Sequence, residues 1–196
     1  MAGLKATTGK KVAVLVAPGL EEVEALAPLD ILFRAGIPAD LISVTDSRQV
    51  TSSHQVVLSC STTLDDLSEA DLESYDMIFL PGGIPGTPNL KADARVRELV
   101  TQRVRADLPV AAICAAPSIL AELGLLEGRR ATANPSVVQV LADHGAQVSE
   151  ASVVVDGQLL TSRGMATAVD LGLEMVRFYL GDAAVEEMKE RIVYQG

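Results

Sequence analysis

A cysteine, a glutamate and a diglycine are the residues of this chain best suited to chemistry. Cys114 follows the apolar run Val110–Ile113 and precedes Pro117, which opens a short predicted helix. A side chain at such a strand-to-helix turn is held above the edge of a sheet, as a nucleophile must be. Free backbone N–H groups and the positive end of the helix favour the thiolate over the thiol. The alternative is a buried, inert cysteine, because free cysteines are among the most buried residues.

Glu24 is the candidate acid–base partner of this cysteine. It lies one turn into a predicted helix, Glu22–Ala35, that follows the first predicted strand. A favourable interaction with the positive helix end accounts for Glu21 and Glu22 on a solvated face. Glu24 can instead point toward the strand ends, where a carboxyl group near a thiolate in a poorly solvated cleft stays protonated. It can then donate a hydrogen bond to the sulfur.

The diglycine Gly82-Gly83 ends another predicted strand without side chains. It either forms a tight turn or offers a backbone N–H group to an oxyanion or an oxidised sulfur. The N–H group of Ala115 is the natural second donor. Function gathers at the carboxyl ends of the strands in a doubly wound sheet, so we expect these loops to lie together.

Short apolar runs alternate with amphipathic segments, which is typical of βαβ units and a mostly parallel sheet. The predicted strands are Val12–Ala17, Ala39–Val44, Asp76–Leu80, Val110–Ile113, Ala131–Ala133, Ser152–Val155 and Leu159–Thr161. The predicted helices are Glu22–Ala35, Ala92–Arg105, Pro117–Leu123, Ala166–Leu180 and Ala183–Ile192. Gln49–Leu58 is predicted as a small antiparallel ribbon. We therefore expect a doubly wound α/β fold with helices on both faces of the sheet.

The composition excludes several classes of protein. A chain of 196 residues with 48% hydrophobic and 21% charged residues suits one packed domain. A net charge of −10 without a basic stripe argues against nucleic acid as a partner. The apolar runs are too short to span a membrane and no secretory signal is visible, so we expect no membrane partner and a cytoplasmic location.

The cysteines and histidines form no pattern typical of a metal site or a disulfide framework, so we predict no metal and no cofactor. Cys60 follows an apolar strand, and we expect it to be buried or at an interface. His144, in the run Asp143-His144-Gly145, is predicted to lie at the exposed end of a helix.

Four short motifs, spread over nearly the whole chain from about Lys11, carry a resemblance to a known family. They are Glu21-Glu22-Val23-Glu24, Leu80-Pro81-Gly82-Gly83, Ala111-Ala112-Ile113-Cys114-Ala115-Ala116-Pro117 and Leu160-Thr161-Ser162-Arg163-Gly164. In this order they resemble the ThiJ/PfpI superfamily, and most of all its parkinsonism-associated deglycase branch. Four motifs in register are far more specific than any one of them.

The resemblance implies a flavodoxin-like fold in a single domain over residues 11–196, after a flexible N-terminal extension at residues 1–10. It implies that Cys114 and Glu24 are catalytic, that Gly83 and Ala115 supply backbone donors, and that the protein is a homodimer. The apolar residues of the first helix, Leu26, Leu29, Ile31, Leu32 and Phe33, exceed what one sheet face needs and favour the same assembly.

Gly82 and Asn134 are predicted to line the site, and at Asn134 the chain departs from the family pattern. Many relatives place a histidine where Asn134 stands before Pro135, and asparagine cannot take a proton at neutral pH. His54 corresponds roughly to an arginine near the dimer interface of the human relative. The proteases of the superfamily carry a histidine directly after the cysteine, where this chain has Ala115, so peptide hydrolysis is disfavoured.

Two functions remain open. The first is cofactor-free conversion of small reactive aldehydes, such as glyoxal and methylglyoxal or their early protein adducts, to hydroxy acids through a Cys114 hemithioacetal. Such an enzyme contributes to protection against carbonyl and oxidative stress. The second is a non-catalytic redox sensor or chaperone that acts through oxidation of Cys114 to sulfenic and sulfinic acid. Both need the same site.

Overall fold

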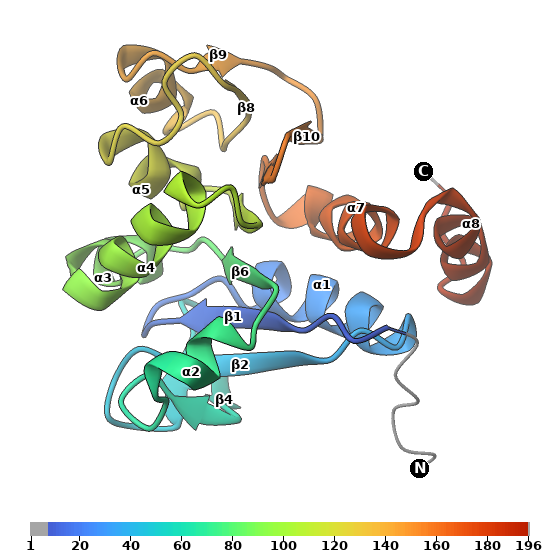
Figure 1. Ribbon diagram of the computed structural model, residues 1–196, viewed down its shortest axis with the longest axis horizontal. Coiled ribbons are helices and arrows are strands. Elements are labelled where there is room, and N and C mark those ends of the chain that lie inside the picture. The colour runs from blue at the N-terminus through green and yellow to red at the C-terminus, as the bar shows by residue number, and fades with distance from the viewer. Residues whose placement is uncertain (1–7, 196) are drawn as a thin grey trace.

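The computed structural model describes residues 8–195 and places a seven-stranded sheet between two layers of helices (Figure 1). The strands of this sheet are β1 (Val12–Val16), β2 (Ala39–Ser43), β5 (Thr62–Thr63), β6 (Met77–Leu80), β7 (Val110–Ile113), β10 (Val153–Asp156) and β11 (Leu159–Ser162). Their order is β10-β11-β7-β6-β1-β2-β5, and only the β10–β11 pair is antiparallel. The predicted doubly wound, mostly parallel α/β fold is confirmed.

The central strands are short aliphatic runs buried on both faces. Every residue of β1, β6 and β7 is buried, which explains why these segments read as continuous apolar stretches without alternation. Because β1, β6 and β7 are parallel neighbours, the loops that follow them leave the same edge of the sheet.

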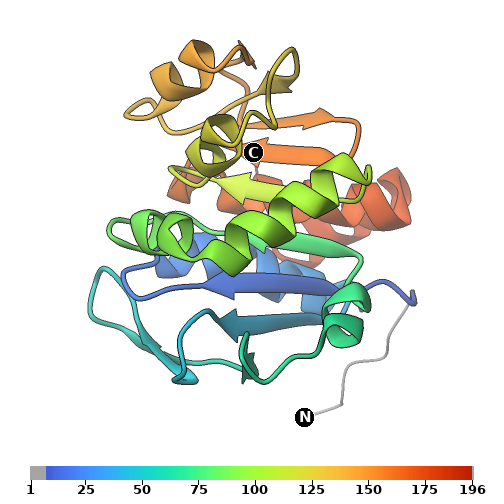
Figure 2. The same cartoon turned by 60° about the vertical axis from the view of Figure 1, so that its left-hand side comes forward.

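Eight α-helices in the described part of the chain cover the two faces of the sheet. They are α1 (Glu22–Arg34), α2 (Glu69–Glu73), α3 (Gly86–Ala92), α4 (Ala94–Arg105), α5 (Pro117–Glu122), α6 (Val138–Asp143), α7 (Ala168–Leu180) and α8 (Asp182–Arg191). One apolar core lies between the sheet and α1, α7 and α8, and the other lies between the sheet and α3 to α6. Figure 2 shows α4 lying across the front of the sheet, with α7 behind it.

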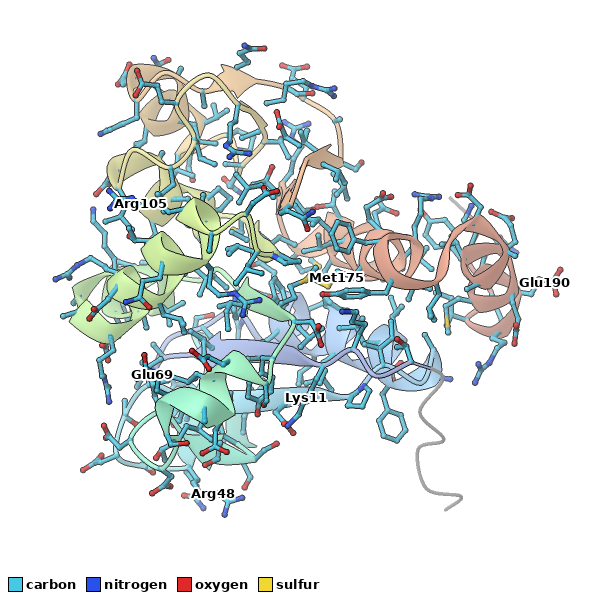
Figure 3. The ribbon with its side chains drawn as sticks, in the orientation of Figure 1. Lys11, Arg48, Glu69, Arg105, Met175 and Glu190 are labelled. Carbon is cyan, nitrogen blue, oxygen red and sulfur yellow. The ribbon has the colours of Figure 1, made fainter. Side chains whose placement is uncertain are left out.

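Close packing of α1 against α7 fixes the helix that carries Glu24. A Cβ on Gly172 of α7 would stand only 3.0 Å from the Cα of Pro28 in α1, so the two backbones approach through the missing side chain. Met175, labelled in Figure 3, is fully buried in the same layer. This contact holds the start of α1 at the edge of the sheet where the functional loops gather.

Two small pairs of strands lie outside the main sheet. The antiparallel pair β3 (Gln49–Thr51) and β4 (Val57–Ser59) confirms the predicted ribbon. In the parallel pair β8 (Arg130–Ala131) and β9 (Gln147–Val148), the strand predicted at Ala131–Ala133 ends at Ala131 and lies outside the main sheet. The reason is that the N–H group of Thr132 donates to the side-chain Oγ1 of Thr161 at 3.0 Å, which takes the chain away from a backbone ladder.

The predicted helix Ala92–Arg105 is divided at Asp93, whose extended backbone ends α3 and whose carboxylate caps α4. Two further helices, α2 and α3, were not predicted. The first begins with a capping box in which Ser68 and Asp71 satisfy each other's backbone N–H groups. The second begins at Pro85 without a capping side chain, so the sequence offers little sign of it.

The remaining predictions concern the chain ends and the surface. Of the predicted extension at residues 1–10, only 8–10 are described, and Lys10 there binds the carboxylate of Asp76 at 2.8 Å. His144 follows the last residue of α6 and is exposed, as predicted. Within residues 8–195, we find no helix that is both long enough and apolar enough to cross a membrane.

Candidate active site

Cys114 occupies a strained turn between β7 and α5. Its φ of 63° is left-handed, a conformation rare for any residue but glycine and typical of a nucleophile held at a sharp strand-to-helix turn. Both backbone polar groups of Cys114 form hydrogen bonds. The Cys114 N–H donates to the carbonyl of Ser162 at 3.0 Å, and the N–H of Asn134 donates to the Cys114 carbonyl at 2.9 Å. The thiol itself is half-buried.

Glu24 reaches the cysteine from the first turn of α1. Its side chain is 1% exposed and is hydrogen-bonded to the side chain of Cys114. Its Oε2 accepts the N–H of Gly82 at 3.0 Å. Glu21 caps the helix by accepting the Glu24 N–H at 2.7 Å, which fixes the backbone from which Glu24 extends.

The diglycine makes room for this contact. A Cβ on Gly82 would stand 2.5 Å from Glu24 Oε2 and 2.6 Å from the Cβ of Cys114, so no other residue fits between them. Gly83 has a φ of 100°, and a Cβ there would collide with the backbone of Leu20 and Glu21. The N–H groups of Gly83 and Ala115 both donate to the Cys114 sulfur. The structure thus gathers the predicted residues at one point.

Burial controls the protonation of the pair. Burial, with the charge of Glu21 adding to it, raises the pKa of Glu24 to about 7. Burial and the negative charge of Glu24 raise the pKa of the Cys114 thiol to about 12, while the N–H groups of Ala115 and Gly83 act in the opposite direction. The sequence indicates those donors but not the burial that opposes them.

The two groups titrate together because they share a hydrogen bond. The first proton leaves the pair near pH 7, and the second is held to high pH because the pair already carries a negative charge. Between these limits one proton is shared by an acid and a nucleophile. The site can therefore supply a thiolate and a proton to the same substrate.

Asn134 and Gly164 complete the surroundings of the pair. Asn134 lies beside the cysteine turn, where its backbone N–H donates to the Cys114 carbonyl. Gly164 was part of a family motif but had no predicted role. A Cβ on Gly164 would stand 3.4 Å from Asn134 Nδ2 and 3.9 Å from Glu24 Oε1, so this glycine lies between the two side chains.

His54 lies outside this group. Its Nδ1 stands 3.1 Å from both carboxylate oxygens of Glu22, and its side chain is exposed. One ligand atom each from Glu21, Glu22 and His54 lie within 4.8 Å of one another, a spacing at which a metal ion could bind. No spacing in the sequence indicates this cluster, because its members come from the start of α1 and from the turn of the β3–β4 ribbon.

Comparisons with known proteins agree with this architecture. Residues 10–178 match the model of the DJ-1/PfpI family. The chain is 32% identical to protein dj-1beta of Drosophila melanogaster, over 94% of this chain and 97% of that protein. It is 35% identical to protein DJ-1 homolog B of Arabidopsis thaliana over 93% of this chain, but spans only 41% of that longer protein. The solved structure of oxidized DJ-1 from Toxoplasma gondii superposes with a TM-score of 0.86 at 29% identity, covering 95% of this chain and all of the other. This chain therefore belongs to the DJ-1/PfpI family.

Proposed function

We propose that this protein converts small 2-oxoaldehydes, of which glyoxal and methylglyoxal are the simplest, to hydroxy acids without a cofactor. The observation that carries the proposal is the hydrogen-bonded pair of Glu24 and Cys114, which shares one proton above about pH 7 and receives two backbone N–H groups at the sulfur. Early adducts of the same aldehydes on proteins present the same carbon centre, so the proposal includes them as substrates.

The chemistry begins with addition. The Cys114 sulfur forms a bond to the aldehyde carbon, the carbonyl electrons move to oxygen, and that oxygen takes the proton from Glu24. The N–H groups of Gly83 and Ala115 are placed to stabilise the oxygen as negative charge develops. The product of this step is a hemithioacetal, and Glu24 is left as a carboxylate.

Isomerisation and hydrolysis follow. The Glu24 carboxylate removes the proton from the former aldehyde carbon and returns it to the neighbouring carbon, while the hydroxyl proton moves from the first oxygen to the second, which converts the hemithioacetal to a thioester. Water then cleaves the carbon–sulfur bond, releases the hydroxy acid and restores the thiol. One aldehyde and one water give one hydroxy acid, so no oxidant or reductant is consumed.

Turnover of methylglyoxal by the purified, reduced protein tests the proposal. We expect lactate to form at a rate proportional to protein, without glutathione and unchanged by EDTA. The EDTA arm also addresses the cluster of Glu21, Glu22 and His54, which we give no part in the chemistry. Absence of lactate, or a rate that requires glutathione, would mean that the mechanism is wrong.

Oxidation of Cys114 is the second candidate function. A half-exposed thiol with two N–H donors and an adjacent acid can hold the oxygens of a sulfinate as well as those of an aldehyde adduct. The structural similarity to an oxidized DJ-1 supports this alternative. It predicts a single modification by peroxide and no turnover.

We also propose that the protein acts as a homodimer through the outer side of α1 and the neighbouring ribbon. Val23, Phe33 and Val57 are 41%, 50% and 60% exposed, although all three are large and apolar. Ile31 and Leu32, which the sequence analysis counted with this surface, are instead buried within the subunit. Light scattering at micromolar concentration should give twice the chain mass, and Phe33→Glu should shift it toward the monomer. A monomer from the unmodified protein would contradict the proposal.

A further inference from the structure

The amide of Asn134 is held in one orientation beside the reactive cysteine. Its Oδ1 accepts two hydrogen bonds from one residue, the Ser136 N–H at 3.0 Å and the Ser136 Oγ at 2.8 Å. Because Oδ1 faces Ser136, the Nδ2 group of the same amide must point away from Ser136. The backbone of Asn134 is itself fixed by its hydrogen bond to the Cys114 carbonyl.

The Nδ2 group has no acceptor within residues 8–195, although it has two protons to donate. It stands 3.4 Å from the point where a Cβ of residue 164 would lie, and Glu24 Oε1 stands 3.9 Å from the same point. A carboxyl group and an amide donor thus lie on either side of a small gap. The gap exists because residue 164 is glycine.

The gap can be filled by a methyl group at residue 164. Gly164 has a φ of 165°, an extended value that any residue adopts. A methyl group there would stand in van der Waals contact with the Asn134 amide, at 3.4 Å, and would fill the gap. The residue can therefore be changed to alanine without backbone strain, so Gly164→Ala can test the role of the gap.

We propose that Asn134 Nδ2 donates a hydrogen bond to the second oxygen of a 2-oxoaldehyde, the one on the carbon next to the aldehyde. This inference rests on the proposed function and assigns its substrate specificity. The first oxygen is held by the N–H groups of Gly83 and Ala115, so the second needs a separate donor. Ser136 is a positioning residue, because it acts only by orienting the amide.

The chemistry makes such a donor useful at the isomerisation step. When Glu24 removes the proton from the former aldehyde carbon, the electrons move toward the neighbouring carbonyl and negative charge develops on its oxygen. A fixed amide N–H stabilises that charge and keeps its own proton. Proton transfer therefore remains with Glu24, and the donor is present at every pH at which the protein is folded.

A comparison of two aldehydes on the same variants tests the proposal. Methylglyoxal has the second oxygen and propanal does not, but both form a hemithioacetal with Cys114. The measured quantity is the dissociation constant of each adduct, from the protection of Cys114 against iodoacetamide in a Cys60→Ser background. The kcat of lactate formation is measured in parallel.

We expect Asn134→Asp, which replaces the donor by an acceptor, to weaken the methylglyoxal adduct by about tenfold or more and to leave the propanal adduct unchanged. Ser136→Ala should weaken the methylglyoxal adduct by roughly threefold, because the amide can then rotate. Gly164→Ala, which leaves both hydrogen-bonding side chains in place, should also weaken only the methylglyoxal adduct, so the test does not depend on one variant folding.

Equal loss for both aldehydes, or loss for neither, would overturn the assignment of Asn134. The two proposals fail separately. An unmodified protein that forms no lactate but discriminates between the aldehydes through Asn134 would refute the proposed function and support the oxygen-binding role. A protein that forms lactate equally well with Asn134→Asp would refute that role and leave the proposed function standing.

Discussion

The two cysteines of this protein stand in contrasting surroundings, although burial raises the thiol pKa of both. Cys60 lies just after β4 and is 2% exposed. Its backbone is paired with Arg48, whose carbonyl accepts the Cys60 N–H at 2.7 Å. Within the described residues, no acidic side chain is hydrogen-bonded to its sulfur. Cys114, by contrast, is half-exposed and touches an acid and two N–H donors.

The difference shows what burial alone does to a thiol. Around Cys60, burial suppresses ionisation, and the nearby charge of Arg48 opposes it without a direct contact to the sulfur. Around Cys114, burial also disfavours ionisation, but it acts on two groups, Cys114 and Glu24, that can transfer one proton between them. Reactivity is therefore expected to depend on the partners of the sulfur as well as on its exposure.

Removing each sulfur in turn gives the largest expected effect. Cys114→Ser should lower methylglyoxal turnover by at least about a thousandfold, because an alkoxide is far harder to form than a thiolate at neutral pH. Cys60→Ser should leave turnover within about twofold, since Cys60 takes no part in the proposed chemistry. The measurement is the initial rate of lactate formation by each folded variant. Activity that survives Cys114→Ser would break the contrast between the two cysteines.

Peroxide should distinguish the same two thiols without any substitution. We expect mild treatment to add two oxygen atoms at Cys114 and to leave Cys60 unmodified. The rates should differ by roughly a hundredfold, because the Cys114 sulfur is partly exposed and receives two backbone N–H groups, whereas Cys60 is 2% exposed. Peptide mass spectrometry after a time course gives both rates. Modification that begins at Cys60 would show that exposure of the folded thiol does not control oxidation.

Much of the difference between Cys114 and Cys60 can be predicted from the sequence, but not all of it. The apolar run Val110–Ile113 followed by a cysteine and a proline predicts the strand, the turn and the helix, because each signal is local. The burial of Cys60 was anticipated for the same reason.

What could not be predicted depends on contacts between distant segments. The hydrogen bond between Glu24 and Cys114 requires α1 to be fixed by α7, a packing that no local pattern encodes. The strand expected at Ala131–Ala133 ends at Ala131, because at Thr132 the side chain of Thr161 takes the place of a backbone partner. The orientation of the Asn134 amide follows from Ser136 only once the loop is folded.

The free energy of unfolding should fall as Glu24 ionises in the folded protein. The pKa of this carboxyl is raised by burial from its ordinary value of 4.5 to about 7. Between these values the folded protein holds a proton that the unfolded chain has lost, so stability falls as the pH rises through this window. Glu24→Gln stays neutral at both pH values. The free energy of unfolding of this variant, minus that of the unmodified protein, should therefore be about 2 kcal/mol larger at pH 8 than at pH 5.

Urea unfolding at the two pH values measures this difference. Cys60→Ala is the matched control, because it alters a buried site with no carboxyl at the sulfur, and its effect on stability should be the same at both pH values. A pH-independent effect of Glu24→Gln would mean that Glu24 ionises in the folded protein as it does in the unfolded chain.

The smallest expected effect is on the rate of thiol alkylation, and it reports directly on where the shared proton lies. The thiol pKa of about 12 describes the second proton of the pair, which is lost while Glu24 is already ionised. The thiolate that reacts at pH 7 arises in the first step, near pH 7, when Glu24 keeps a proton and donates it to the sulfur. Glu24→Leu removes that donor and leaves the burial, so the thiol should ionise at a higher pH than the first step of the pair. Iodoacetamide should then react with Cys114 about tenfold more slowly at pH 7, which corresponds to about 1.4 kcal/mol. Glu24→Gln keeps an N–H donor near the sulfur and should slow the reaction less. The Cys60 rate, followed in the same digests, should not change. Faster alkylation in Glu24→Leu would show that the carboxyl is ionised beside a neutral thiol at pH 7, and the pair would then begin its chemistry with the proton on sulfur.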